Sequence, residues 1–64
     1  MKKTQVKKVN QGTYFKLTES ETAPVWVRGE FVREAQRYSC YKFDDTNHEK
    51  LIKGTQTIFV DFEF

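Results

Sequence analysis

The C-terminal segment alternates regularly between apolar and polar side chains. Ile58, Val60, Phe62 and Phe64 occupy every second position. A period of two in β-branched and aromatic residues is typical of a strand that buries one face. We therefore predict a strand over residues 56–64 and place Phe64 in the core.

The middle of the chain predicts a β-hairpin. Residues 25–32 and 38–43 are rich in β-branched and aromatic residues, and residues 33–37 between them are polar. Gly29 lies inside the first of these segments, where a glycine often marks a β-bulge or a close backbone approach. We expect the two strands to pair around the polar turn.

The N-terminal part predicts shorter strands. Residues 13–18 form an apolar-rich segment that indicates a strand, and residues 5–9 indicate a weaker one. Asn10-Gln11-Gly12 between them is a turn signal. The sequence leaves open whether residues 1–4 form a basic arm outside the fold or an edge strand.

One short helical turn completes the set of elements. Thr46 and Glu49 have the spacing of a helix capping box. We therefore expect a helical turn over residues 46–53, ended by Gly54. Together the elements predict a mainly β fold: a small antiparallel curled sheet or SH3-like barrel of about four or five strands. A flat meander with one open face is the alternative.

Composition limits the chain to one domain and one kind of core. Sixty-four residues suffice for a single domain, residues 1–64, with a small core, and the six Phe, three Tyr and one Trp supply most of its apolar area. Cys40 is the sole cysteine, so no intrachain disulfide can form. The N-terminus leads into no apolar stretch, and we expect neither a signal peptide nor a membrane span. These features favour a cytoplasmic protein.

The charge is distributed unevenly along the chain. Residues 1–16 carry five lysines and no acid, whereas residues 43–64 carry five acids and two lysines. The molecule is therefore expected to be dipolar, although its net charge is only +2. The N-terminal lysines either improve solubility and protect a sheet edge or attract phosphate groups.

The predicted hairpin suggests a binding face. If Val25, Val27, Phe31 and Cys40 point into the core, the opposite face combines aromatic rings with a guanidinium group. Its members would be Trp26, Arg28, Glu30, Val32, Tyr41 and Phe43. The other interpretation is that these rings are core residues, and a slip of one residue in register would exchange the two faces.

Three functions without catalysis are compatible with this face. The first is a protein interface centred on Trp26, Arg28 and Tyr41, because such side chains often anchor interfaces. The second is single-stranded DNA or RNA binding by the same rings, including Phe43. In that case phosphate contacts would come from Lys2, Lys3, Lys7 and Lys8. The third is a structural homo-oligomer that uses the C-terminal strand as an edge.

Metal binding and catalysis find little support. Asp45, Asn47 and Glu49 alternate as in a calcium loop, but Lys50 stands where such a loop requires glycine. His48 is the only histidine and has no nucleophile beside it in the sequence. We expect no metal, no cofactor and no enzymatic activity.

Residues 25–64 resemble a group of short, uncharacterised β-rich proteins of gut bacteria and their phages or mobile elements. The similarity is carried by the segments Val27-Arg28-Gly29-Glu30, Tyr38-Ser39-Cys40, Phe43-Asp44-Asp45-x-Asn47-His48-Glu49, Lys53-Gly54 and Val60-Asp61-Phe62-Glu63-Phe64. The resemblance implies a cytoplasmic accessory protein of bacterial or phage origin. It implies no activity and no binding residues.

Overall fold

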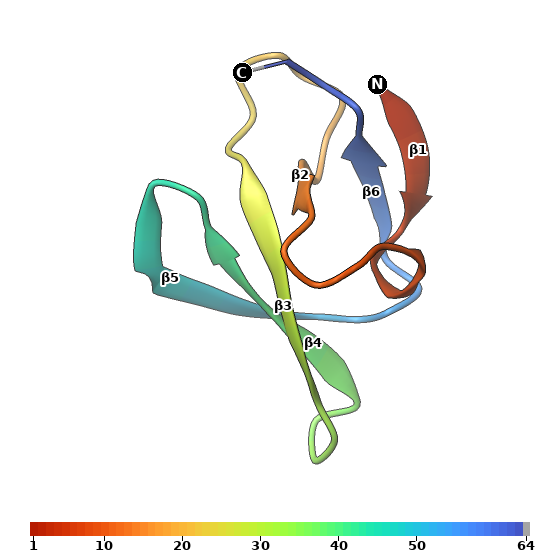
Figure 1. The fold of residues 1–64 in the computed structure, drawn as a ribbon, viewed down its shortest axis with the longest axis vertical. Coiled ribbons are helices and arrows are strands. Elements are labelled where there is room, and N and C mark those ends of the chain that lie inside the picture. Colours follow the sequence, from red (N-terminus) through yellow and green to blue (C-terminus); the bar gives the residue numbers. More distant parts are fainter. Residues whose placement is uncertain (64) are drawn as a thin grey trace.

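The structure, a computed structural model, describes residues 1–63 as two antiparallel sheets and one short 3-10 helix (Figure 1). The elements are β1 (Lys2–Gln5), η1 (Val6–Lys8), β2 (Tyr14–Phe15), β3 (Trp26–Val32), β4 (Arg37–Lys42), β5 (Asp45–Ile52) and β6 (Thr57–Val60). The larger sheet has the order β2-β3-β4-β5, and the smaller sheet pairs β1 with β6. The predicted mainly β, antiparallel fold is confirmed, but the strands of residues 1–63 do not close into a barrel.

Strands β3 and β4 form the predicted hairpin, and their pairing contains a bulge. The register shifts between Arg28 and Phe31, where two residues of β3 oppose Ser39 alone. Gly29 is one of the two, and a Cβ at this position would overlap the carbonyl oxygen of Ser39. The bulge predicted from Gly29 is therefore confirmed. Because it adds one residue to β3, Phe31 lies on the face of Arg28 and not on that of Val27.

The predicted helical turn over residues 46–53 is wrong, because this segment is strand β5. Its antiparallel pairing with β4 places Ile52 opposite Tyr38 and Lys50 opposite Cys40. A helix of two turns is marginal by itself, whereas the strand satisfies the backbone groups along the edge of β4. At its start, the side chain of Asp45 accepts a hydrogen bond from the Asn47 amide (3.3 Å) in place of a capping box.

The N-terminal residues form an edge strand and not a free arm. β1 pairs with β6 in the register Lys2 to Val60. The weak strand predicted over residues 5–9 is wrong, because η1 follows β1 directly. The 3-10 turn buries Val6, whose amide donates to the Gln56 carbonyl (3.2 Å), and the Lys7 amide donates to the Gly54 carbonyl (3.0 Å). These two hydrogen bonds tie η1 to the connection between β5 and β6.

The strand predicted over residues 13–18 is shorter than expected. Only Tyr14 and Phe15 belong to β2, which pairs with β3. The next residue, Lys16, bridges instead to Phe59 of β6 through two backbone hydrogen bonds of 2.9 Å. The chain therefore crosses at this point from the larger sheet to the smaller one. The predicted turn before β2 is confirmed by Gly12, which has φ = 93°.

Strand β6 ends earlier than the alternation in sequence predicts. It covers Thr57–Val60, and Asp61 then adopts φ = 59°, outside the extended region. Phe64 lies outside the described residues. β6 pairs with β1 on one side and with Lys16 on the other. The C-terminal strand is therefore paired with β1 along one side and bridged at Phe59 on the other, and the predicted homo-oligomer stays a prediction.

The core lies between the two sheets. It consists of Val6, Phe15, Trp26, Cys40, Ile52 and Ile58. Cys40 is buried as predicted, and Val27 is buried on the opposite face of β3. The prediction for Phe31 is wrong, since this residue is 46% exposed. Its position beyond the bulge places it outside the layer that the smaller sheet covers.

A buried lysine fastens the connection between β2 and β3. Lys16 is only 2% exposed, and its ammonium group donates to the backbone carbonyls of Ser20 (3.3 Å) and Glu21 (2.9 Å). The same group lies 4.8 Å from the ring centroid of Phe62. These contacts satisfy a charge that would otherwise be costly to bury. Lys16 is therefore a structural lysine and belongs to no exposed basic patch.

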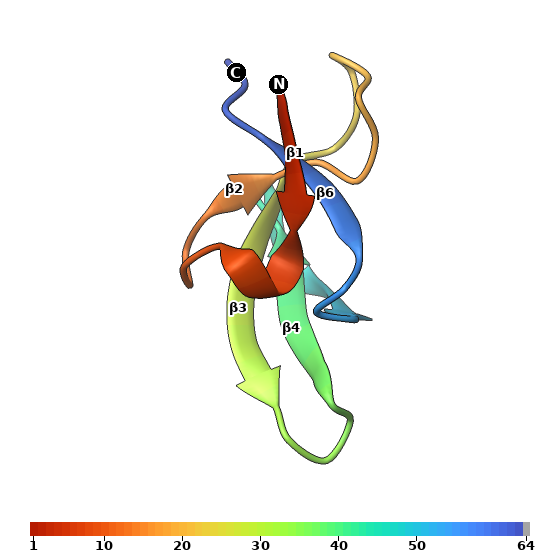
Figure 2. The ribbon, with the colours of Figure 1, turned by 90° about the vertical axis from the view of Figure 1, so that its right-hand side faces the viewer.

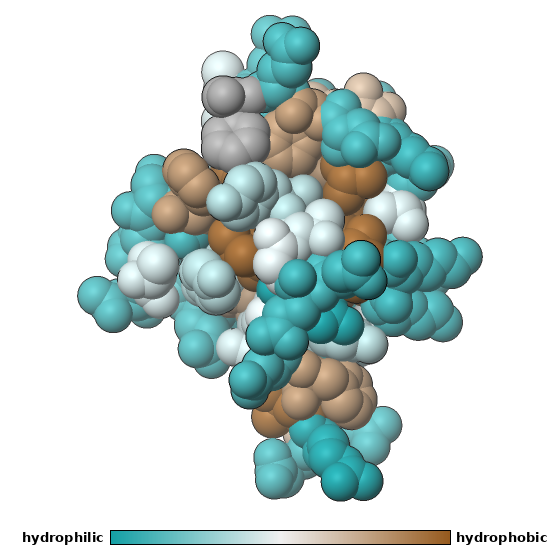
Figure 3. Space-filling model, in the orientation of Figure 1, coloured by the Kyte–Doolittle hydropathy of each residue, from teal (hydrophilic) through white to brown (hydrophobic). Residues whose placement is uncertain are grey.

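The turn end of the hairpin projects away from the rest of the molecule. Figures 1 and 2 show the far half of β3 and β4 extending beyond η1 and the smaller sheet. Its outer part carries a hydrophobic patch bordered by hydrophilic side chains in Figure 3.

Among residues 1–63, no helix has the length and apolar character needed to cross a bilayer.

Candidate functional site

The binding face predicted from the hairpin is not assembled in the structure. Trp26 is only 6% exposed and belongs to the core. Lys50 lies 5.7 Å from its ring centroid, and the His48 ring meets it edge to face at 5.7 Å. Both residues come from β5, the strand that replaces the predicted helix. The indole therefore cannot serve as the predicted contact centre.

Arg28 and Tyr41 lie on opposite faces of the sheet. Arg28 pairs with Cys40, whereas Tyr41 pairs with Val27. Directly paired residues point to the same side, and neighbours along a strand point to opposite sides. The predicted grouping of Trp26, Arg28 and Tyr41 is therefore divided, with the first two on the core side.

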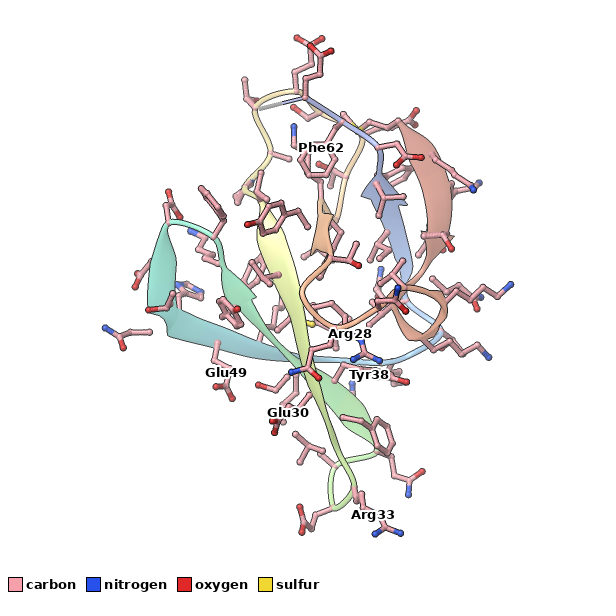
Figure 4. All side chains as sticks on the ribbon, in the orientation of Figure 1. Arg28, Glu30, Arg33, Tyr38, Glu49 and Phe62 are labelled. Atoms are coloured by element: carbon pink, nitrogen blue, oxygen red, sulfur yellow. The ribbon has the colours of Figure 1, made fainter. Side chains whose placement is uncertain are left out.

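A stacked column of side chains spans the bulge on the core side of the hairpin. The guanidinium carbon of Arg28 lies 4.2 Å from the ring centroid of Tyr38. The ring of Phe31 lies 5.0 Å from that of Tyr38, tilted by 58°. Figure 4 shows Arg28 and Tyr38 close together where β3 and β4 cross. The column holds Tyr38 between a cation and a second ring and leaves Phe31 at the solvent end.

Two rings of this column, Phe31 and Tyr38, line a hollow that we call the basic groove. The groove has a volume of about 370 Å³ and lies between the β3–β4 turn, η1 and the start of the β5–β6 connection. It is lined by Lys7, Phe31, Ala35, Gln36, Arg37, Tyr38, Lys53, Gly54 and Thr55. At its base a Cβ on Gly54 would lie 3.0 Å from the Tyr38 ring and 3.2 Å from the Lys7 Cβ. The glycine therefore lets these two side chains approach each other.

The basic groove continues into a second hollow along β5. Arg37 and Lys53 line both hollows, and Lys50 and Leu51 belong to the second. Among the described residues that line them, four are cationic and none is acidic. Three other hollows on the described surface each include at least one carboxylate. Positive charge is therefore concentrated beside the hairpin, although the net charge of the chain is only +2.

The four N-terminal lysines predicted to contact phosphate are distributed over different surfaces. Lys7 lines the basic groove. Lys2 and Lys8 line another hollow, which also includes Asp61. Lys3 is exposed on β1, where its backbone pairs with Phe59. The structure thus supports one of the four as part of the groove.

A second exposed aromatic group lies on the opposite face of the larger sheet. Tyr14 pairs with Val27, which pairs in turn with Tyr41. The Phe43 ring contacts that of Tyr14 at 5.3 Å in an edge-to-face arrangement. Two predicted residues, Tyr41 and Phe43, are therefore associated with one face. Glu49 of β5 pairs with Tyr41, and Glu30 of β3 lines a hollow together with Tyr41, so two carboxylates lie near Tyr41 (both are labelled in Figure 4).

The described part of the chain was also searched for metal-binding groups, and its single cysteine was located. Within residues 1–63, no group of three His, Cys, Asp or Glu side chains is arranged to hold an ion. Cys40 is fully buried, and burial raises the pKa of its thiol above the ordinary value. Its sulfur approaches the backbone carbonyl of Tyr38 at 3.7 Å.

Cys40 is expected to be inert toward thiol reagents in the folded protein at neutral pH. Burial excludes the reagent and disfavours the thiolate that would react. Labelling with 5,5′-dithiobis(2-nitrobenzoate) should be at least about a hundredfold slower than in urea-unfolded protein. Because the folded pKa is raised, thiol ionisation favours the unfolded state only above the unfolded pKa of about 8.5. Rapid labelling of the native protein at neutral pH would contradict the buried position.

Sequence reasoning missed most of the residues of the basic groove. Arg37 and Lys53 are brought together by the β4–β5 pairing, which the predicted helix excluded. Simple alternation along residues 25–32 predicts Phe31 in the core, but the bulge reverses the direction of its side chain. The signal that was available is Gly29, whose bulge implies a change of face for every residue after it.

No protein-family model matches the chain, and searches of curated proteins and of solved structures likewise gave no match.

Proposed function

We propose that the protein is a non-enzymatic binding module that holds an anionic partner in the basic groove. The observation that carries the proposal is the lining of the two adjoining hollows. It includes Lys7, Arg37, Lys50 and Lys53 and no acidic residue among those described. Cations gathered on concave surface raise the local concentration of an anionic ligand.

The scaffold supports this role. Backbone hydrogen bonds join Lys16 to Phe59 and Val6 to Gln56, so the two sheets are linked at several points. We propose that they act as one small scaffold of the SH3-like barrel type. Such a scaffold fixes η1 and the hairpin relative to each other, and the groove lies between these two elements.

Neutralising the groove is expected to weaken binding to polyanions. The variant R37Q/K53Q removes two positive charges that line both hollows. The matched control K2Q/K3Q removes the same charge from β1, whose N-terminal end lies at the opposite end of the molecule from the hairpin turn (Figure 1). On immobilised heparin the groove variant should elute at clearly lower salt than the control.

Circular dichroism should show both variants folded, because the exchanged side chains lie outside the core. If the two variants elute at the same salt concentration, the binding of heparin is not specific to the basic groove. Failure of the wild type to bind heparin at low salt would contradict the proposal as a whole.

A protein partner remains the second candidate function, on the surface around Phe43 and not around Trp26 and Arg28. The aromatic pair Tyr14 and Phe43 favours it, since their side chains are 44% and 46% exposed. Tyrosine and phenylalanine are enriched at protein interfaces. Chemical cross-linking of the variant Y14A in comparison with wild type would test this surface.

A further inference from the structure

We propose that the anionic partner of the basic groove is single-stranded nucleic acid, with one base stacked on Phe31. This inference rests on the proposed function and adds the chemical class of the partner. It differs from the nucleic-acid interface predicted from sequence, because that interface used Trp26 and Tyr41. Trp26 is buried in the core, and Tyr41 lies on the other face of the sheet.

The first argument is the exposed ring at the mouth of the groove. Nearly half of Phe31 is in contact with solvent, and the ring is supported from behind by Tyr38. Arg28 in turn supports Tyr38 at 4.2 Å. A ring held in place in this way offers a stacking surface at little cost in side-chain entropy. Unpaired bases stack on such rings, whereas bases in a duplex already stack on each other.

The second argument is the position of the cations around that ring. Lys7, Arg37 and Lys53 line the same hollow as Phe31 and come from three separate segments of the fold. A base that covers Phe31 would bring its flanking phosphates into the hollow that these side chains surround. Lys50 extends the positive charge along β5 into the second hollow. A chain of phosphates fits this succession of charges better than a single anion does.

The third argument is the chemical mixture of the lining. The hollow also presents Gln36 and Thr55, whose side chains can donate and accept hydrogen bonds. Its volume of about 370 Å³ is in the lower part of the range for organic ligand sites. An acidic protein segment would satisfy the cations, but its carboxylates would leave the ring of Phe31 uncovered. Single-stranded nucleic acid uses both the ring and the charges.

The test compares three fluorescein-labelled probes by anisotropy: dodecathymidylate, a twelve-base-pair DNA duplex and a twelve-residue polyglutamate peptide. Wild type should bind the single strand at least about tenfold more tightly than the other two probes. F31A should lose about tenfold in affinity for the single strand, and F31Y, which keeps the ring, should retain most of it. R37Q/K53Q should lower the salt dependence of single-strand binding by about 1.4 in log–log slope.

The outcomes separate this inference from the proposed function. If the peptide or the duplex binds as tightly as the single strand, or if F31A binds the single strand like wild type, the inference is wrong. The proposed function survives those results provided that R37Q/K53Q still weakens binding. If none of the probes binds at low salt, both fail. Circular dichroism of F31A guards against loss of fold as the cause of a lost affinity.

Discussion

The substitution G29A is expected to remove most of the stability of the protein and to leave a large unfolded fraction at room temperature. Gly29 lies in the β3 bulge, where the Ser39 carbonyl of β4 passes so close that a Cβ would overlap its oxygen. The obstructing atom is backbone, so the strands themselves must separate to make room. We expect a loss of about 3 kcal/mol or more in the free energy of unfolding. A domain of this size has little more than that in total.

A matched glycine provides the control. Gly12 has φ = 93° and open space around an added Cβ. G12A should therefore lose only about 1–2 kcal/mol, from backbone strain alone. Urea denaturation followed by circular dichroism measures both variants. If G29A is as stable as G12A, the Ser39 carbonyl of β4 does not lie as close to Gly29 as the structure places it.

Local patterns in the sequence predicted the elements whose pairing partners are near in the chain. Residues 25–32 and 38–43 are joined by a short polar turn, so alternation and turn chemistry suffice to specify the hairpin. β6 was predicted in part although its partner β1 lies at the other end of the chain, because the alternation around the fully buried Ile58 is regular. The two hairpin strands lie close to their predicted ranges because their backbone preference and their burial pattern agree.

The segment over residues 45–52 shows why the remainder was not predicted. Its Thr46 and Glu49 have the spacing of a capping box, and seven of the eight residues of β5 are exposed. The strand therefore has almost no alternation of buried and exposed side chains. It forms because β4 offers an edge of unpaired backbone groups, a requirement of the whole fold that no local window contains.

The basic groove depends on these non-local pairings. Lys7 reaches it through η1, and Lys53 and Gly54 reach it at the end of β5. A helix in place of β5 would give the chain a different path to these residues. The candidate site could be predicted only as a class of residues, aromatic and cationic, and not as a set of positions. The single shift at Gly29 is enough to exchange which rings face the core.

Because the bulge at Gly29 decides which rings face the core, the two aromatic residues of β3 should contribute very differently to stability. W26A should lose about 3–5 kcal/mol in the free energy of unfolding, because it removes a large side chain from between the sheets. This is about the total stability of a domain of this size, so W26A should be largely unfolded before any urea is added. F31A should lose less than about 1 kcal/mol, because Phe31 is 46% exposed and lies beyond the covered layer. The alternation of residues 25–32 without a bulge would predict the reverse order, with Phe31 in the core and Trp26 in solvent.

The comparison needs a probe other than indole fluorescence, since one variant lacks the tryptophan. Urea denaturation by far-ultraviolet circular dichroism serves for both, and W26F keeps an aromatic ring at the buried position. W26F should lie between wild type and W26A, because it restores part of the lost volume. The wild-type indole should emit at short wavelength and resist quenching by iodide. If W26A were stable and F31A unfolded, the assignment of Trp26 to the core and of Phe31 to the exposed wall of the basic groove would be wrong.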